Sequence, residues 1–306
     1  MDVFLSALGE EVEDPEEESF LVFSQTIPSA LDLGIVDPKI PILDITVAGR
    51  DLSIHQSPTV LSSNRKAGTT GAVVWKVTPL FADWLADTKN ILFRSSILGT
   101  ASTVLELGCG VSGIVSVTLA PLVRRYIATD QDYVFKLLKQ NIAQNAKQSS
   151  VTKAKSSRGG RGKTASTAQT ERINTDIEAL ALDWELDSLS ALSEVLTQQT
   201  KSGTEDVPPG VDAIVACDCI YNDALIEPFV STCTDICRLR TVSSSKDAVK
   251  PTVCIIAQQL RTAGVFEAWL KRFHRDFRVW RLPERLSSRG LGENSGFVVH
   301  VGVLRP

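Results

Sequence analysis

The stretch Leu105-Glu-Leu-Gly-Cys-Gly-Val-Ser-Gly113 decides the fold class. The stretch begins within a short run rich in apolar residues, Thr103–Leu107, and a longer such run, Ile114–Leu122, follows it. The first run is typical of a buried strand and the second of a helix, so the glycines form a tight strand-to-helix turn. Glycine permits such a turn and lets a ligand approach the backbone closely. The sequence therefore predicts a ligand site at the start of an α/β unit.

Strands and helices alternate on from this turn. The further expected strands are Tyr126–Asp130, Leu180–Trp184, Val211–Asp218, Thr252–Ala257, Phe277–Leu282 and Gly296–Leu304. The further expected helices are Pro79–Asp87, Tyr133–Asn145, Asp223–Leu239 and Val265–Phe273. This alternation implies a mostly parallel sheet covered on both faces. Because no helix separates the last two strands, we expect a seven-stranded Rossmann-like α/β sheet with an antiparallel last strand.

Two regions, 1–65 and 66–306, differ in character. Residues 10–18 form an acidic run that we expect to be a solvated, mobile tail. Ile45–Ala48 and Asp51–His55 flank Gly49-Arg50 and predict a hairpin, so the first region is a small N-terminal β-rich extension. The second region is the α/β domain. Between Lys147 and Lys163 it carries six basic residues and no acidic one, which predicts a disordered insert at about 147–172. Residues 198–210 form a second polar insert.

Composition excludes several classes of protein. The 306 residues are 43% hydrophobic and 22% charged, and the net charge of −4 offers no general attraction to nucleic acid. The longest apolar runs are far shorter than the roughly 18–20 residues of a membrane span. The first ten residues lack a basic region, so we expect an intracellular chain with reduced cysteines, located in the cytoplasm with the nucleus as the alternative. The six cysteines fit no usual zinc spacing, and no metal is expected.

The glycine spacing alone leaves two ligands open. Gly108-x-Gly110-x-x-Gly113 also fits a dinucleotide fingerprint, and Asp130 fits the ribose-binding acid in either case. Glu106 argues against a dinucleotide and favours S-adenosylmethionine, since a carboxylate two residues before the first glycine would repel a pyrophosphate. S-adenosylmethionine carries an ammonium and a sulfonium, which nearby acids suit. The alternative is that Glu106 caps or pairs within the core.

Four motifs, in this order, resemble the class I seven-stranded methyltransferases: 105–113, Ala128-Thr-Asp130, Leu182-Asp-Trp184 and Asp218-Cys-Ile-Tyr221. Within that class the set is similar to the family 16 protein methyltransferases, and Gly71-Ala-Val-Val-Trp75 matches the segment before that family's first core helix. Gly110-Val-Ser-Gly-Ile114 with Thr129-Asp-Gln131 looks closest to the fungal ribosomal protein lysine methyltransferase 5 branch. The resemblance covers about residues 71–304 without the inserts.

The resemblance implies an S-adenosylmethionine-dependent protein-lysine N-methyltransferase. Its substrate would be a large-subunit ribosomal protein or another translation protein. It would be a monomer that binds no membrane and contacts nucleic acid only through the basic loop. The implied cofactor contacts are Trp75, Glu106, Gly108, Gly110, Asp130, Asp183, Trp184 and Cys217.

The resemblance also implies roles for most of these residues. Glu106 and the glycines would line the methionine and ribose side, and Asp130 would bind the ribose hydroxyls. Asp183 would meet the adenine amino group. The implied catalytic residues are Asp218, which would orient the amine, and Tyr221, which would form an aromatic wall.

Other interpretations stay open on the residues alone. Asp130 could end a strand in a turn, the Trp184 ring could belong to the core, and Tyr221 could pack on the sheet at a helix entry. The nucleophile could be a protein histidine or a small molecule. A non-catalytic binding module and a dehydrogenase are further alternatives, although the intact Asp218-x-x-Tyr221 pattern argues against the binding module.

Overall fold

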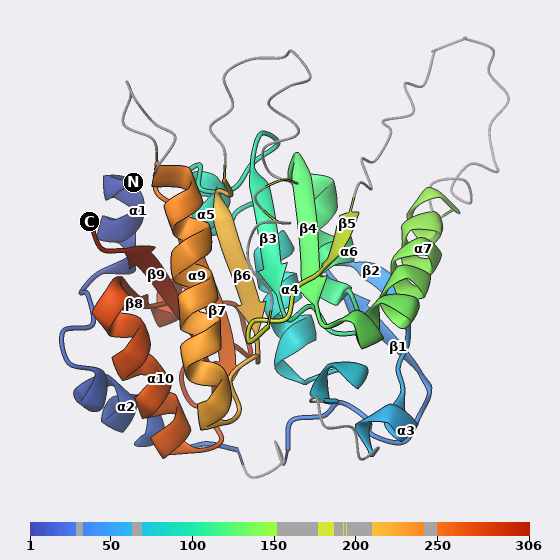
Figure 1. Ribbon diagram of the computed structural model, residues 1–306, viewed down its shortest axis with the longest axis horizontal. Helices are drawn as coiled ribbons and strands as arrows, with labels where there is room; N and C mark the ends of the chain where they lie inside the picture. Colours follow the sequence, from blue (N-terminus) through green and yellow to red (C-terminus); the bar gives the residue numbers. More distant parts are fainter. Residues whose placement is uncertain are drawn as a thin grey trace, which may run out of the picture.

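A single mixed sheet organises the protein (Figure 1). The computed structural model describes residues 1–28, 33–62, 69–151, 177–186, 192, 194, 210–241 and 250–306. Seven strands lie in the order β5-β4-β3-β6-β7-β9-β8. They are β3 (Thr103–Leu107), β4 (Arg125–Asp130), β5 (Ile177–Ala181), β6 (Ala213–Cys217), β7 (Val253–Gln259), β8 (Phe277–Arg281) and β9 (Phe297–Leu304). The expected seven-stranded α/β sheet is confirmed.

The sheet changes direction at its last strand. β3 to β7 run parallel to one another, whereas β9 pairs antiparallel with both β7 and β8. β9 therefore lies between the two strands that precede it in the chain, and the expected antiparallel last strand is confirmed. The carboxyl ends of β3, β4, β6 and β7 share one edge, which is where ligands bind in open α/β sheets.

Helices cover both faces of the sheet. One face packs mainly against α4 (Val77–Ala86), α6 (Ile114–Leu119) and α7 (Phe135–Val151). The other packs against α9 (Ile226–Thr241) and α10 (Ala263–Asp276), with α2 (Pro15–Phe23) lying on α10. The shorter helices are α1 (Asp2–Leu8), α3 (Pro58–Leu61) and α5 (Ile91–Arg94). Strand alternation sends Leu105 and Leu107 to one core and Val104 and Glu106 to the other.

The acidic N-terminal run is folded onto the domain. Asp14 caps α2 by accepting the N–H of Glu16 at 2.8 Å. Val12 donates its N–H to the carbonyl of Val279 on β8 at 2.7 Å. Glu18 is 7% exposed, and its carboxylate lies 2.9 Å from Nε2 of the buried His300. The expectation of a solvated tail is therefore wrong for Val12 and Glu18, because helix packing and a buried partner offset the local charge.

The expected hairpin is present next to this segment. β1 (Ile42–Val47) and β2 (Arg50–His55) pair antiparallel. Their two-residue turn is Ala48-Gly49, one residue earlier than expected, and both residues have positive φ, 51° and 69°. Such a turn matches the twist of paired strands. Asp83 on α4 accepts the Ala48 N–H at 2.9 Å and so fastens the hairpin to the α/β domain.

The inserts fall largely outside the described residues. The basic insert was expected to be disordered from residue 147, but the backbone of residues 147–151 continues α7. Its remaining residues to 172, and the second insert up to 209, lie outside the described residues. In the part of the chain that the structure describes, no helix is long and apolar enough to cross a membrane.

Candidate active site

The glycine turn between β3 and α6 leaves no room for side chains. Gly108, Gly110 and Gly113 have φ of 69°, 60° and 59°, a conformation that side chains disfavour. A Cβ on Gly108 would lie 2.6 Å from Sγ of Cys219. A Cβ on Gly110 would lie 3.1 Å from the carbonyl oxygen of Gly71. Both positions therefore require glycine, and the Gly71 segment closes over the turn.

The amide donors of the turn are already used within the protein. The N–H groups of residues 109–111 donate to the Thr129 carbonyl at 3.1 Å, the Asp130 carboxylate at 2.7 Å and the Gly71 carbonyl at 2.8 Å. A pyrophosphate site needs such groups free and no carboxylate among them. This arrangement favours a ligand without phosphate, and it opposes the dinucleotide interpretation of the glycine spacing.

Glu106 is anchored beneath the turn. It is 3% exposed, and its Oε2 accepts hydrogen bonds from Ser116 Oγ and Tyr126 Oη, both at 2.8 Å. Its Oε1 has no partner among the described residues. Burial foremost, with Asp130 nearby, raises its pKa to about 7. Glu106 thus pairs within the core, as the alternative held, and still leaves one carboxylate oxygen available to a cationic ligand.

Asp130 joins β4 to the glycine turn. Its Oδ2 accepts the Gly110 N–H and its Oδ1 accepts the Gln131 N–H, each at 2.7 Å. Burial foremost, with the charge of Asp183 adding to it, raises its pKa to about 6. Each oxygen keeps a further lone pair, so Asp130 does more than end a strand: it can also accept hydrogen bonds from ligand hydroxyls.

The third motif lies beyond its strand. β5 ends at Ala181, so the expected strand Leu180–Trp184 was placed too late, and Asp183 and Trp184 follow the strand at the ligand edge. The Leu182 N–H still donates to the Asp130 carbonyl at 2.9 Å, so the contact with β4 extends to the start of the motif. Asp183 accepts a hydrogen bond from Gln131 Nε2 at 3.2 Å.

Trp184 has both a core side and a site side. Its ring packs edge-on against Phe229, with centroids 5.3 Å apart. Its other side lies about 3.4 Å from where a Gly108 Cβ would sit. The indole Nε1 is buried without a hydrogen-bond partner among the described residues. A buried donor left unpaired is costly, so this N–H fits a ligand acceptor.

Asp218 sits at the end of β6 in a strained conformation. Its φ is 58°, and its side chain is 2% exposed. Arg261 donates two hydrogen bonds to its carboxylate, at 2.6 and 2.5 Å, and the Gln259 N–H donates a third at 3.2 Å. Strained residues that the surroundings hold in place cluster at functional sites. Asp218 is therefore clamped rather than free.

Arg261 extends this clamp to the N-terminal segment. Its Nε donates to the Leu33 carbonyl at 3.0 Å, and its guanidinium lies 5.1 Å from the centre of the Trp75 ring. Trp75 in turn forms an isolated bridge with Ile35. Sequence reasoning missed Arg261 and Gln259, although both follow the expected strand Thr252–Ala257 at the ligand edge, which was the available signal.

Cys217 and Tyr221 complete the set. The Cys217 thiol lies 3.6 Å from Thr78 Oγ1, and burial raises its pKa well above the usual range. Tyr221 is 39% exposed, so its ring does not pack into the sheet. The structure thus brings every expected residue to the carboxyl edge of the sheet. Within the described ranges, no group of His, Cys, Asp or Glu side chains could hold a metal ion.

The buried carboxylates predict a pH dependence. Glu106 and Asp130 have raised pKa values of about 7 and about 6, so the folded protein binds their protons more tightly than the unfolded chain does. The ligand-free protein should therefore lose stability as pH rises from about 4 to about 7. A bound cation favours the ionised carboxylates, so stabilisation by S-adenosylmethionine should grow over the same range.

Thermal melts from about pH 5 to about pH 8, with and without ligand, test this. Glu106→Gln keeps the hydrogen-bond acceptor and should flatten both dependences. Asp44→Asn, on an exposed face of β1, is the control and should leave them as in the unmodified protein. A Glu106→Gln profile that matches the unmodified protein would contradict the raised pKa.

Comparison with known proteins identifies the family. A lysine methyltransferase family model matches residues 55–198. Ribosomal lysine N-methyltransferase 5 from Zygosaccharomyces rouxii is 34% identical over 234 residues, covering 72% of this chain and 70% of that protein. The chain belongs to the lysine methyltransferase family. The ribosomal lysine N-methyltransferase 5 of Vanderwaltozyma polyspora is 30% identical to this methyltransferase and covers 81% of it and 84% of its own length.

Two further matches are more distant. A diaminohydroxyphosphoribosylamino-pyrimidine deaminase of Schizosaccharomyces pombe is 26% identical over 88% of this methyltransferase, which spans about half of that protein, 53%. The N-methyltransferase NodS from Bradyrhizobium japonicum, solved with S-adenosylhomocysteine, is 12% identical with a TM-score of 0.37, over 74% of this chain and 93% of that one. The family assignment stands on the closer relatives.

Membership settles the reaction class. The protein is an S-adenosylmethionine-dependent methyltransferase that acts on protein lysine. The resemblance stated from the four motifs is confirmed, and the dehydrogenase and the non-catalytic module are set aside. The orphaned Trp184 N–H, the glycine cradle and the acidic groups around it fit this cofactor.

Proposed function

We propose that this methyltransferase modifies a lysine of a large-subunit ribosomal protein or of another translation protein. The main observation in support is its 34% identity, over 72% of its length, to a protein named for ribosomal lysine methylation. Relatives with the same name from Vanderwaltozyma polyspora and Candida glabrata are 30% identical. We place the enzyme in the cytoplasm or nucleus and expect it to act as a monomer.

We assign the cofactor site to the carboxyl edge of the sheet. Glu106 would receive the cationic methionine end through its unpartnered Oε1, and Asp130 would accept the ribose hydroxyls. Asp183 and Trp184, just past β5, would hold the adenine, the indole N–H supplying a donor. Trp75 and Cys217 would line the side nearest β6. When bound, S-adenosylmethionine supplies an already activated methyl group.

The protein has to present a neutral amine in line with that methyl group. At pH 7 only about one free lysine in 2,500 is neutral, because its pKa is about 10.4. An unpaired carboxylate beside the amine would favour the charged form and oppose the reaction. Arg261 offsets the charge of Asp218 through two short hydrogen bonds. We therefore assign Asp218 to orienting the amine through a remaining lone pair without holding it protonated.

Tyr221 would form the outer wall of the lysine channel. It lies three residues after Asp218 and is 39% exposed, as an aromatic residue open to a substrate would be. Correct alignment of reacting groups can contribute about 7–11 kcal/mol to the lowering of a reaction barrier. Positioning by Asp218 and Tyr221, with exclusion of water, accounts for the protein's part in the reaction.

The substrate assignment predicts a specific labelling result. Ribosomal subunits purified from a fungal strain lacking the enzyme should accept radiolabelled methyl groups from S-adenosylmethionine, in one protein and on lysine. Mass spectrometry of the labelled band identifies the residue. A label on histidine, or only on a small molecule or a protein outside the translation apparatus, would contradict the proposal. The Gly110→Arg variant supplies the inactive control.

A further inference from the structure

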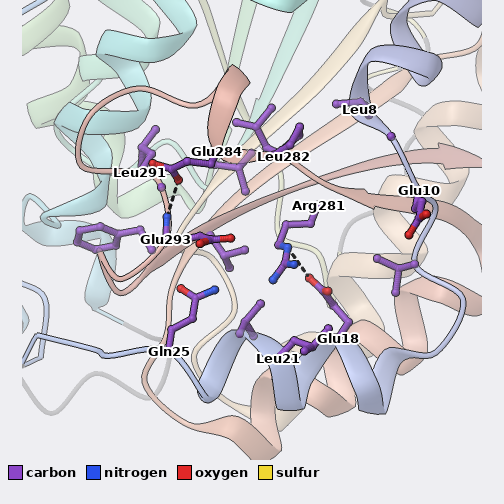
Figure 2. A pocket seen from close by; sticks show the side chains of 18 of the residues that line it. Leu8, Glu10, Glu18, Leu21, Gln25, Arg281, Leu282, Glu284, Leu291 and Glu293 are labelled. Atoms are coloured by element: carbon purple, nitrogen blue, oxygen red, sulfur yellow. Dashed lines mark hydrogen bonds and ion pairs between the residues drawn. The ribbon is translucent and has the colours of Figure 1, made fainter.

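A cavity of about 830 Å³ lies beside the candidate active site. Residues 8–25, which include α2, form one wall, and the end of β8, the β8–β9 connection and the start of β9 form the other (Figure 2). Its volume is within the range of pockets that enclose a ligand. None of the residues assigned to the cofactor site lines it, and neither do Asp218 and Tyr221.

The lining of this cavity is strongly acidic. Eight carboxylates and only two guanidinium groups line it. The side chains of Glu10, Glu13, Glu17 and Glu293 are exposed and have no partner within the described part of the chain. One of the two arginines, Arg281, is already engaged with Glu18 at 3.5 Å. The cavity therefore presents an excess of uncompensated negative charge to solvent.

Some apolar side chains lie among these carboxylates. Leu21 on α2 is 46% exposed and lies among the lining residues, together with the buried Leu282 and Val298. Lysine and arginine side chains combine an apolar stem with a charged end. Unpaired carboxylates beside an exposed leucine are complementary to both parts of such side chains, whereas an acidic segment would be repelled.

The segment that follows β7 lies between the cavity and the Asp218 clamp. Leu260 lines the cavity, and the residues on either side of Leu260 hold Asp218: Gln259 through its N–H and Arg261 through its guanidinium. Consecutive residues lie about 3.8 Å apart. The cavity wall and the Asp218 clamp thus share one short segment, residues 259–261.

We propose that this cavity is the docking groove for a lysine- and arginine-rich segment of the protein substrate, outside the lysine that is methylated. The inference rests on the proposed function in so far as the enzyme acts on a protein. The groove binds the positive charges of this substrate segment, and Asp218 and Tyr221 receive the target lysine. This division lets one surface select the protein and another perform the chemistry.

Peptide binding tests the groove directly. The probe is a short fluorescent peptide of alternating lysine, arginine and alanine, compared with the same peptide carrying glutamine at each basic position. The basic peptide should bind the unmodified enzyme, more weakly as salt increases. The triple variant Glu13→Gln, Glu17→Gln, Glu293→Gln should bind it about tenfold more weakly. The glutamine peptide should bind neither enzyme appreciably.

A matched variant controls for overall charge. Asp44→Asn, Glu194→Gln, Asp235→Asn also removes three exposed acids, none of them lining the cavity, and should keep the unmodified affinity. Calorimetry with S-adenosylhomocysteine should give unchanged binding in both triple variants. Equal peptide affinity in the two triple variants would overturn the groove, even if ribosomal protein is methylated. Failure to label ribosomal protein would overturn the proposed substrate and leave the peptide result standing.

Discussion

Gly110→Arg is expected to abolish binding of S-adenosylmethionine while leaving the fold in place. The position has φ of 60°, and a Cβ there would lie 3.1 Å from the Gly71 carbonyl. The side chain would either enter the ligand space or displace the Gly71 segment that closes the turn. The added guanidinium would also repel a cationic cofactor. Calorimetry should detect no binding, and circular dichroism should show an unchanged helix content.

Two variants separate the effect of side-chain bulk at residue 110 on ligand binding from the effect of backbone strain. Gly110→Ala introduces the strain of a left-handed residue, about 1–2 kcal/mol, with little bulk, and should weaken binding less. Gly99→Arg adds the same charge and size at a glycine where a Cβ would meet no atom within 4 Å, and this variant should bind normally. Normal affinity in Gly110→Arg would show that the ligand lies elsewhere.

Asp218→Ala should lower the rate of methyl transfer by about 10²-fold or more, the scale on which a small misplacement of reacting groups is felt. The substitution removes the carboxylate that orients the amine and leaves the Arg261 guanidinium, 21% exposed, without its partner. Affinity for S-adenosylhomocysteine should stay within a few-fold, because its proposed contacts are Glu106, Asp130 and Asp183. Single-turnover methylation, measured beside calorimetric binding, distinguishes the two effects.

A double-mutant cycle tests whether Asp218 and Arg261 act as one unit. Arg261→Leu leaves the Asp218 carboxylate unpaired, which favours a charged amine, so the pH–rate profile should shift to higher pH. Adding Asp218→Asn should reverse that shift, and the double variant should lose little more activity than either single variant. A purely structural role for Arg261 would leave the profile unmoved. Full activity in Asp218→Ala would remove the motif from the mechanism.

Local patterns predicted the sheet well. β3 has the expected bounds, and β6 to β9 differ from expectation by one or two residues, because apolar runs between polar turns mark buried strands clearly. β5 was placed three residues too late, since its position depends on its pairing with β4, a contact between distant parts of the chain. α2 was missed because its buried Glu18 is stabilised by His300, 282 residues further along the chain.

The site could be predicted in position but not in partners. The motifs placed Glu106, Asp130, Asp183 and Asp218 at the ligand edge, because strand ends follow from the alternation of strands and helices. Their hydrogen-bond partners, such as Ser116 on α6 and Arg261 after β7, follow only from the folded arrangement. Arg261 offsets the negative charge of Asp218, which would otherwise be a free carboxylate, and no local sequence pattern reveals this ion pair.

The anchoring of residues 8–25 on β8 and β9 has a consequence for the timing of assembly. Synthesis runs from the N-terminus, so residues 8–25 leave the ribosome before residues 281–299 have been made. The wall supplied by α2 therefore has no counterpart until β8 and β9 have also been made. A nascent chain that stops before β8 would hold its glutamates without the opposite wall. The proposed docking groove thus forms only after the parallel strands that carry the cofactor residues have been made.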